Sequence, residues 1–197
     1  ETKDIRGTLP ALRPLGQVQN TFIVAEGPDG LFLIDQHAAH ERVLFERLTE
    51  QIRTGQKDAQ TLLEPVTVVL DPLHAEIVDN NSGLLSENGF NIEHFGNQTY
   101  ILRGIPTLLS SGEPGQTFVE IIEMMANGGD FETWEDRAAY SIACHSAIRA
   151  GKTMKKSEIV ELVQQLEECY QPQTCPHGRP TMIHLPLSRL EREFGRK

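Results

Sequence analysis

The chain has 197 residues and a mass of 22.0 kDa, and 39% of its residues are hydrophobic and 23% charged. This composition is typical of one large globular domain or of two small lobes. No apolar run approaches the roughly 18–20 residues that cross a bilayer, and the polar N-terminus does not resemble a signal peptide. Three cysteines are too few for a disulfide scaffold and indicate a reducing compartment. Because the sequence does not begin with Met, we expect a fragment of a longer protein.

The net charge of −10 is unevenly distributed. Residues 1–144 contain 9 Lys/Arg and 22 Asp/Glu, whereas residues 145–197 contain 9 Lys/Arg and 6 Asp/Glu. Any contact with a polyanion should therefore use the C-terminal quarter. The acidic balance of the whole chain predicts weak binding of nucleic acid by the chain alone.

Hydrophobic periodicity and turn residues predict alternating strands and helices. Strands are predicted at 16–25, 31–34, 66–70, 90–94, 100–103 and 181–185. Helices are predicted at 36–52, 72–88, 117–125, 135–150, 157–169 (with Ser157 as N-cap) and 187–194. The intervening segments 53–60 and 171–180 are predicted to be irregular. The pattern predicts an α/β (α+β) fold, in which one lobe, residues 1–65 plus 135–197, contains an inserted lobe at 66–134.

The first candidate metal-ligating stretch is Asp35-Gln36-His37-Ala38-Ala39-His40-Glu41, followed by Glu46. On a helix, His37 and Glu41 share one face, one turn apart, and can grip one ion. Asp35 precedes the helix and can direct a carboxylate to the same point. Seen alone, such a pair is more often a solvated surface pair, and His40, off this line, is predicted to be a surface residue.

Two further stretches contain thiols and imidazoles. In residues 143–151, Cys144 alone would be a small buried side chain, whereas Cys175-Pro176-His177 in a Pro- and Gly-shaped loop is a stronger metal signal. Together the three stretches supply more ligands than one tetrahedral zinc needs. They suggest two ions bridged by Glu41, which is a standard arrangement for phosphodiester hydrolysis. Thiolates favour zinc, and the oxygen-rich side favours manganese or magnesium.

These stretches carry a family resemblance. DQHAAHERVLFE (35–46) resembles the D-Q-H-A-x-x-E-x-x-x-x-E motif in the C-terminal domain of MutL mismatch repair proteins. ACHSAIRAG (143–151) and CPHGRP (175–180) resemble two motifs of its endonuclease-active branch. The resemblance runs from Gly16 almost to the end of the chain, with the motifs in family order. It implies a dimerisation and endonuclease lobe with an inserted regulatory lobe.

The implied activity is metal-dependent nicking of duplex DNA without base specificity. By the family pattern the catalytic residues are Asp35, His37, Glu41 and Glu46, and the metal ligands are His37, Glu41, Cys144, Cys175 and His177. Arg149 and Arg179 are expected to contact phosphate. The implied cofactors are Zn²⁺ in a structural or regulatory role and Mn²⁺ for activity, with ATP bound only by an N-terminal domain outside this chain.

The implied partners are a second copy of the chain, duplex DNA, the DNA polymerase sliding clamp and, through the full-length chain, a mismatch-recognition protein. No membrane contact is expected, and the implied location is the bacterial cytoplasm, with the nucleoid. The segment QTLLEP resembles the family's clamp-binding motif, with Gln60, Leu62, Leu63 and Pro65 as contacts, although the two leucines could simply begin the next strand.

Three questions stay open from the sequence. The main alternative to an endonuclease is a non-catalytic dimerisation and clamp-docking module with structural zinc. A zinc hydrolase of small substrates is a weaker reading, since it leaves the clamp-like segment unexplained. The apolar runs Phe22–Ala25 and Leu31–Ile34 could form the dimer surface or be ordinary core strands.

Overall fold

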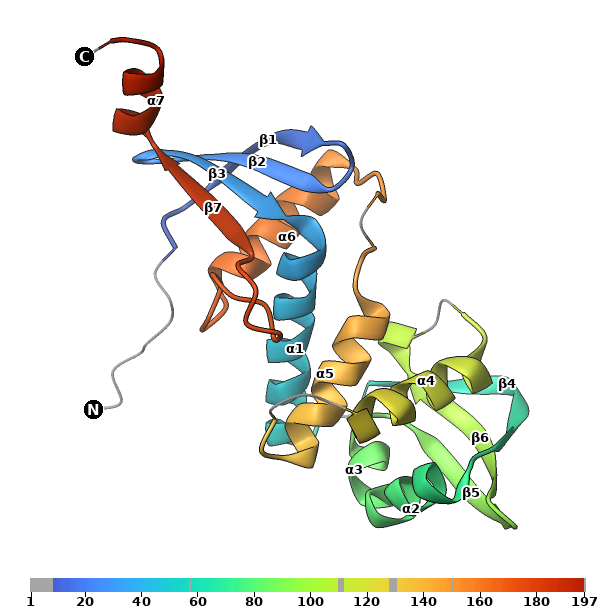
Figure 1. The fold of residues 1–197 in the computed structure, drawn as a ribbon. Helices are drawn as coiled ribbons and strands as arrows, with labels where there is room; N and C mark the ends of the chain where they lie inside the picture. Colours follow the sequence, from blue (N-terminus) through green and yellow to red (C-terminus); the bar gives the residue numbers. More distant parts are fainter. Residues whose placement is uncertain (1–8, 57, 110–111, 128–130, 150, 197) are drawn as a thin grey trace. The chain divides into compact units, whose positions relative to one another are not determined.

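The computed structural model of the chain describes residues 9–56, 58–109, 112–127, 131–149 and 151–196. Helices combine with antiparallel sheets, so the fold is α+β, as predicted (Figure 1). The chain divides into two compact units: unit 1 is residues 1–46 with 147–197, and unit 2 is residues 47–146. The sequence-based division at 66 and 134 stays a prediction. In the described residues, no helix is long and apolar enough to cross a membrane.

Unit 1 contains a four-stranded antiparallel sheet in the order β1-β2-β3-β7. Its strands are β1 (Arg13–Val18), β2 (Phe22–Gly27), β3 (Gly30–Asp35) and β7 (Met182–Pro186), and its helices are the first half of α1 (Gln36–Thr54), α6 (Lys156–Glu167) and α7 (Leu187–Glu193). The β2–β3 hairpin turns at the Gly27–Gly30 segment. Gly30 has φ +140° and lies so close to the backbone of β7 that a Cβ there would clash with the Leu185 carbonyl oxygen.

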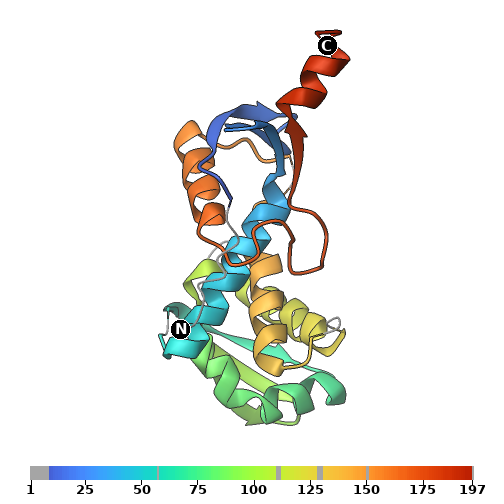
Figure 2. The same ribbon diagram turned by 90° about the vertical axis from the view of Figure 1, so that its left-hand side faces the viewer.

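Helix α6 covers one face of this sheet, as Figure 2 shows. Alternate residues of β2 and β3 point inward, as the period of two in a strand requires. The resulting core joins strand residues to one stripe of α6; it includes Ile23, Ala25, Phe32, Ile34, Ile159, Leu162, Val163 and Leu166. The helical stripe repeats at three and four residues, which is the pattern of an amphipathic helix on a sheet.

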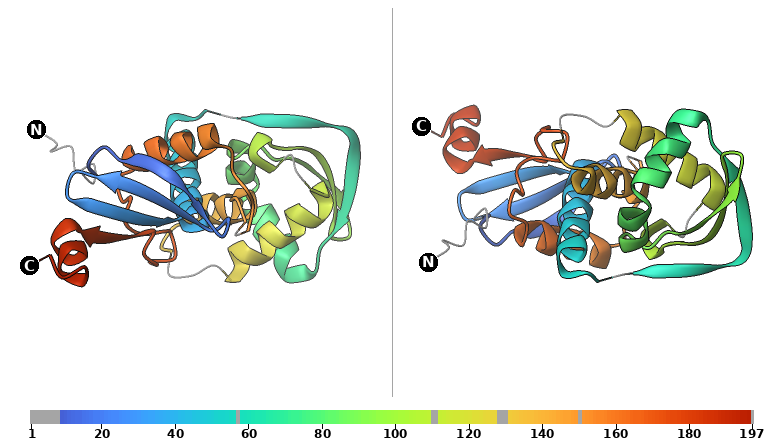
Figure 3. Two further views of the ribbon diagram at one scale, coloured as in Figure 1. Left: turned by 90° about the horizontal axis from the view of Figure 1, so that it is seen from above. Right: turned by 90° about the horizontal axis from the view of Figure 1, so that it is seen from below.

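Unit 2 contains a three-stranded antiparallel sheet in the order β4-β6-β5 (Figure 3). Its elements are β4 (Ala59–Val69), α2 (Pro72–Asn80), α3 (Ser82–Glu87), β5 (Asn91–Gly96), β6 (Thr99–Pro106), the 3-10 turn η1 (Thr107–Leu109), α4 (Pro114–Asn127) and α5 (Trp134–Ser146), together with the second half of α1. Its core includes Phe90 and Phe118, whose rings meet edge to face at 5.3 Å.

Two predicted elements are wrong because polar residues break them. The predicted strand 16–25 is a hairpin, since Gln19 and Asn20 adopt φ of 52° and 50° and reverse the chain between β1 and β2. The predicted helix 72–88 is two helices, α2 and α3. Asn81 separates them with φ −117°, and its side-chain amide donates to the Ile77 carbonyl (2.8 Å).

Three predicted boundaries also differ. Strand β4 begins at Ala59, inside a segment predicted to be irregular. Helix α5 ends at Ser146, before the predicted end at Ala150, which lies outside the described residues. The N-cap of α6 is Lys155 and not Ser157, because the Lys155 backbone N–H donates to the Glu158 carboxylate at 2.6 Å. That bond is half of a capping box.

Candidate metal centre

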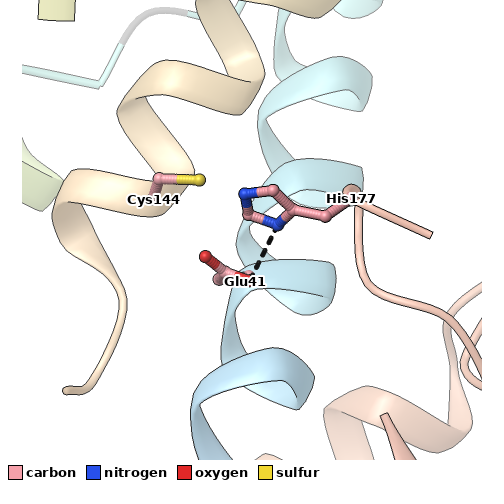
Figure 4. A group of neighbouring side chains, drawn as sticks. All are labelled: Glu41, Cys144 and His177. Atoms are coloured by element: carbon pink, nitrogen blue, oxygen red, sulfur yellow. Dashed lines mark ion pairs between the residues drawn. The ribbon is translucent and has the colours of Figure 1, made fainter. Parts of the chain in front are cut away.

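The centre of the candidate site is the carboxylate of Glu41, in the first half of α1. This side chain is only 5% exposed, and it lies between two imidazoles. His37 Nε2 is 3.3 Å from one carboxylate oxygen, and His177 Nδ1 is 3.4 Å from the other. Figure 4 shows the second pair, which joins α1 to the loop before β7. A buried carboxylate requires a compensating positive charge, from a protonated histidine or from a cation.

The ring of His37 is oriented by a main-chain contact. Its Nδ1 lies 2.9 Å from the carbonyl oxygen of Ile148, and a carbonyl can only accept a hydrogen bond. Nδ1 therefore carries the proton, and in a neutral imidazole Nε2 then presents its lone pair to Glu41. A metal-binding histidine is usually oriented in this way, by a hydrogen bond from its other ring nitrogen to a carbonyl or carboxylate.

The second ligand segment is the loop after α6. Cys175 is buried, and its sulfur lies 3.6 Å from His177 Nδ1. The loop turns back on itself because the Cys175 N–H donates to the Arg179 carbonyl (2.8 Å) and the Gly178 N–H to the Cys175 carbonyl (2.9 Å), with Gly178 at φ +77°. Because His177 Nδ1 is 3.6 Å from the Cys175 sulfur and 3.4 Å from a Glu41 oxygen, the sulfur lies within about 7 Å of the Glu41 carboxylate.

The separations between His177 Nδ1 and its two neighbouring donor atoms fit the ligands of a tetrahedral ion. Zinc–ligand bonds of about 2.0–2.3 Å place neighbouring ligand atoms roughly 3.3–3.8 Å apart. His177 Nδ1 lies 3.4 Å from a Glu41 oxygen and 3.6 Å from the Cys175 sulfur, and both separations lie in this range. Nitrogen, oxygen and sulfur donors together are also a set that zinc accepts. The residues present therefore fit a divalent metal.

Comparison with known proteins gives the family. The model of a family described as the MutL C terminal dimerisation domain matches residues 15–154. The chain belongs to this family. It is 38% identical over 192 residues to the DNA mismatch repair protein MutL of Symbiobacterium thermophilum, covering 94% of this chain and 30% of that protein. It is 39% identical over 201 residues to MutL of Methanoculleus marisnigri, covering 100% and 34%. The chain thus spans about a third of the length of these curated relatives.

Two further residues of the first MutL-like motif make main-chain contacts. Asp35 Oδ1 accepts the backbone N–H groups of His37 (2.9 Å) and Ala38 (3.1 Å), so it caps the start of α1. Glu46 Oε2 and Oε1 accept the N–H groups of Tyr170 (2.7 Å) and Gln171 (3.0 Å). The catalytic roles that the MutL resemblance implies for Asp35 and Glu46 stay predictions.

The remaining predicted site residues are Cys144, Arg149 and Arg179. Cys144, also labelled in Figure 4, belongs to unit 2 and is half-buried near the end of α5. Arg149 and Arg179 are exposed residues of unit 1. The role of Cys144 as a ligand and of the two arginines as phosphate contacts stay predictions.

Sequence reasoning missed two structurally important residues of the first MutL-like motif (35–46), His40 and Gln36. His40 is not a plain surface residue, because its Nδ1 accepts the Ile148 N–H (2.8 Å). Burial, the Lys152 ammonium and His37 lower the pKa of His40 to about 4, so its ring is neutral near pH 7. Gln36 is fully buried, and its amide nitrogen donates to the carbonyls of Asn20, Arg149 and Lys152 at 2.7, 3.3 and 3.2 Å. The only sequence signal for Gln36 is its place in the motif.

Proposed function

We propose that the chain is the metal-dependent endonuclease domain of a mismatch repair protein and nicks duplex DNA. The observation that carries this proposal is the buried Glu41 carboxylate between two imidazoles, with the Cys175 thiol beside one of them. A divalent ion held there would supply Lewis-acid activation of water and of a backbone phosphate.

The residues of the chain have distinct roles in this proposal. Glu41, His177 and Cys175 hold a zinc ion, and the sequence motif adds Cys144 from α5 as a further ligand. His37 presents its Nε2 lone pair on the oxygen-rich side, where Mn²⁺ would bind for activity. Asp35 caps α1 and so fixes the position of His37 in the first helical turn.

The charge distribution supports a DNA contact through unit 1. Unit 2 contains 5 Lys/Arg and 15 Asp/Glu, so it holds the whole net charge, whereas unit 1 contains 13 of each. The segment 149–156 of unit 1 carries exposed Arg149, Lys152, Lys155 and Lys156, and buried Gln36 fixes its backbone at 149 and 152. We propose that phosphates lie along this segment. Contacts to phosphate alone carry no base specificity.

Nicking of supercoiled plasmid tests the activity. With Mn²⁺ the chain should convert supercoiled to relaxed circles, without preference for the cutting position, and excess chelator should stop the reaction. Because the proposed DNA contacts join Lys and Arg side chains to phosphates, activity should fall steeply as salt rises. If the purified chain gives no relaxed product with any of Mn²⁺, Zn²⁺ and Mg²⁺, alone or with the sliding clamp present, the proposed activity is wrong.

The alternative function, a clamp-docking module with structural zinc, is favoured by one segment of β4. Thr61 pairs with Gly104 and Val66 with Leu102, so Leu62–Pro65 bulge out opposite the single residue Arg103. Leu63 is fully exposed. Such a bulge offers an aliphatic side chain to a pocket on a partner, and the two functions are compatible in one chain. Metal removal separates them, because stripping a structural zinc should lower stability strongly.

Replacing Leu63 with alanine should weaken binding to the sliding clamp by roughly 10–100-fold, since burial of a leucine side chain contributes about 1.5–3 kcal/mol. Folding should not change, because this side chain makes no buried contact in the described chain. Surface plasmon resonance on immobilised clamp would measure the affinity. Val69→Ala is the matched control, because Val69 is another exposed residue of β4 at 70% exposure, and equal affinities of the two variants would contradict clamp docking.

We also propose that the chain forms a homodimer through the outer face of the unit 1 sheet. This outer face, opposite α6, includes outward-pointing apolar residues of all four strands: Val18, Phe22, Val24, Leu31, Leu33, Ile183 and Leu185. An antiparallel sheet with one solvated face normally alternates apolar and polar residues, yet here most of the outward positions are also apolar. The family description as a dimerisation domain supports a second copy as the occupant. The ATPase domain and the mismatch-recognition protein are proposed partners of a full-length chain.

A further inference from the structure

Glu46 is bonded at both of its oxygens to the main chain. Oε2 accepts the Tyr170 N–H at 2.7 Å and Oε1 accepts the Gln171 N–H at 3.0 Å. These two amides lie directly after α6, where the loop that carries Cys175 and His177 begins, and Figure 2 shows this loop passing beside α1. The side chain of Glu46 is 16% exposed. Its carboxylate thus attaches the start of the loop to α1.

Arg42, one helical turn before Glu46, holds the same loop at a second point. Its Nε donates to the Thr174 carbonyl at 2.5 Å, the residue before Cys175. Its guanidinium lies 5.6 Å from the centre of the Phe45 ring, and Nη1 is 3.6 Å from Glu46 Oε1. The Arg42 side chain is only 7% exposed, so its long stem is fixed by packing. Arg42 and Glu46 therefore attach the loop to α1 at residues 170, 171 and 174.

We propose that Glu46, with Arg42, is a positioning residue that holds Cys175 and His177 facing Glu41, and that it does not itself ligate the ion. This rests on the proposed metal centre. To bind an ion, Glu46 would have to exchange two charge-assisted hydrogen bonds to amides for the new ligand bond. In its present role it orders the loop before metal arrives, so less conformational entropy is lost on binding.

The expected effect follows from the behaviour of residues behind metal ligands. Loss of such an outer partner typically costs about 10–100-fold in metal affinity. Glu46→Ala should therefore weaken zinc binding by roughly this factor while the number of zinc ions bound per chain stays the same. In the metal-free protein, residues 170–177 should exchange amide hydrogens faster, because both anchoring bonds at 170 and 171 are lost.

The experiment combines two measurements on the whole chain. Zinc affinity and stoichiometry are measured by competition with a chromophoric chelator, and amide exchange of the metal-free protein by mass spectrometry. Glu46→Gln is the gentler variant, which has the same size and one remaining acceptor oxygen, and it should fall between the parent and Glu46→Ala. The matched control is Glu50→Gln, one turn further along α1, because Glu50 is exposed and its carboxylate pairs with Arg53.

The outcomes separate this inference from the proposed function. The positioning role is supported if Glu46→Ala shows lower zinc affinity, unchanged stoichiometry and faster amide exchange at 170–177. Glu50→Gln should show none of these changes. A lost equivalent of zinc with unchanged exchange would make Glu46 a ligand and overturn it, and so would parental affinity and exchange in Glu46→Ala. If the parent chain binds no zinc, the proposed metal centre fails. Slow amide exchange at 170–177 in Glu46→Ala would then also show that Glu46 does not hold the loop.

Discussion

Replacing Glu41 with glutamine should lower zinc affinity and plasmid nicking by more than about 100-fold. An outer partner of a metal ligand is worth 10–100-fold, and a residue that faces both His37 and His177 should be worth at least the upper end of that range. Glutamine keeps the size of the side chain, yet it presents one neutral oxygen and an N–H₂ group in place of two anionic oxygens. The amide donor would meet one of the two imidazoles at the distance now found for a carboxylate, 3.3–3.4 Å.

The measurements are the chelator competition and the plasmid assay with Mn²⁺. Glu161→Gln, an exposed glutamate of α6, is the matched control and should behave like the parent. Cys175→Ser is an independent second variant, which should lose zinc but retain the His37–Glu41 pair on the oxygen-rich side. If Glu41→Gln bound zinc with parental affinity and nicked at the parental rate, the carboxylate would not be the centre of the site.

Local spacing predicted the parts of the site that lie within one element. The four-residue separation of His37 and Glu41 placed both on one helical face, and they are 3.3 Å apart. The Cys175-Pro176-His177 segment was predicted to turn both side chains together, and they are 3.6 Å apart. Such predictions succeed because the backbone geometry of one turn decides the result.

The contacts that sequence reasoning missed join side chains to main-chain groups far away in the chain. His40 accepts an N–H 108 residues later, Arg42 donates to a carbonyl 132 residues later, and Glu46 accepts an N–H 124 residues later. A backbone amide or carbonyl has the same chemistry at every residue, so no side-chain pattern marks the partner. The role of Glu46 was consequently assigned by the family motif as catalytic, and its contacts became visible only in the fold.

The missed breaks in the fold have a similar cause. Asn81 ends α2 through its own side-chain bond to Ile77, and Gln19 and Asn20 turn the chain at positive φ. Asn is common at such positions, but the same residue also occurs within helices and strands at little cost. The apolar periodicity continued through both points and outweighed these weak local signals. The α+β class was predicted correctly because it depends on the hydrophobic periodicity of many elements together. The position of a single break in one element does not change it.

Placing a charge on the outer face of the unit 1 sheet should convert a dimer into monomers. Ile183 lies on β7 and is 59% exposed in the single chain, and it pairs with Leu33 of β3. In a two-fold interface each substitution occurs twice, and each buried unpaired charge costs several kcal/mol or is relieved only by opening the interface. Ile183→Asp should therefore raise the dimer dissociation constant by more than roughly 100-fold, which is about 2.7 kcal/mol.

Sedimentation equilibrium over a range of concentrations would measure this constant, and circular dichroism would show that the monomer stays folded. Because the Ile183 side chain points away from the core around Phe32 and α6, the substitution should leave the melting temperature of the monomer nearly unchanged. Val69→Asp is the matched control, since Val69 is at least as exposed but lies on the sheet of unit 2. If only Val69→Asp dissociated the dimer, the two copies would associate through unit 2. The apolar outer face of unit 1 would then have to be explained by a different partner, because an exposed apolar surface of this extent on an antiparallel sheet is rare unless something covers it.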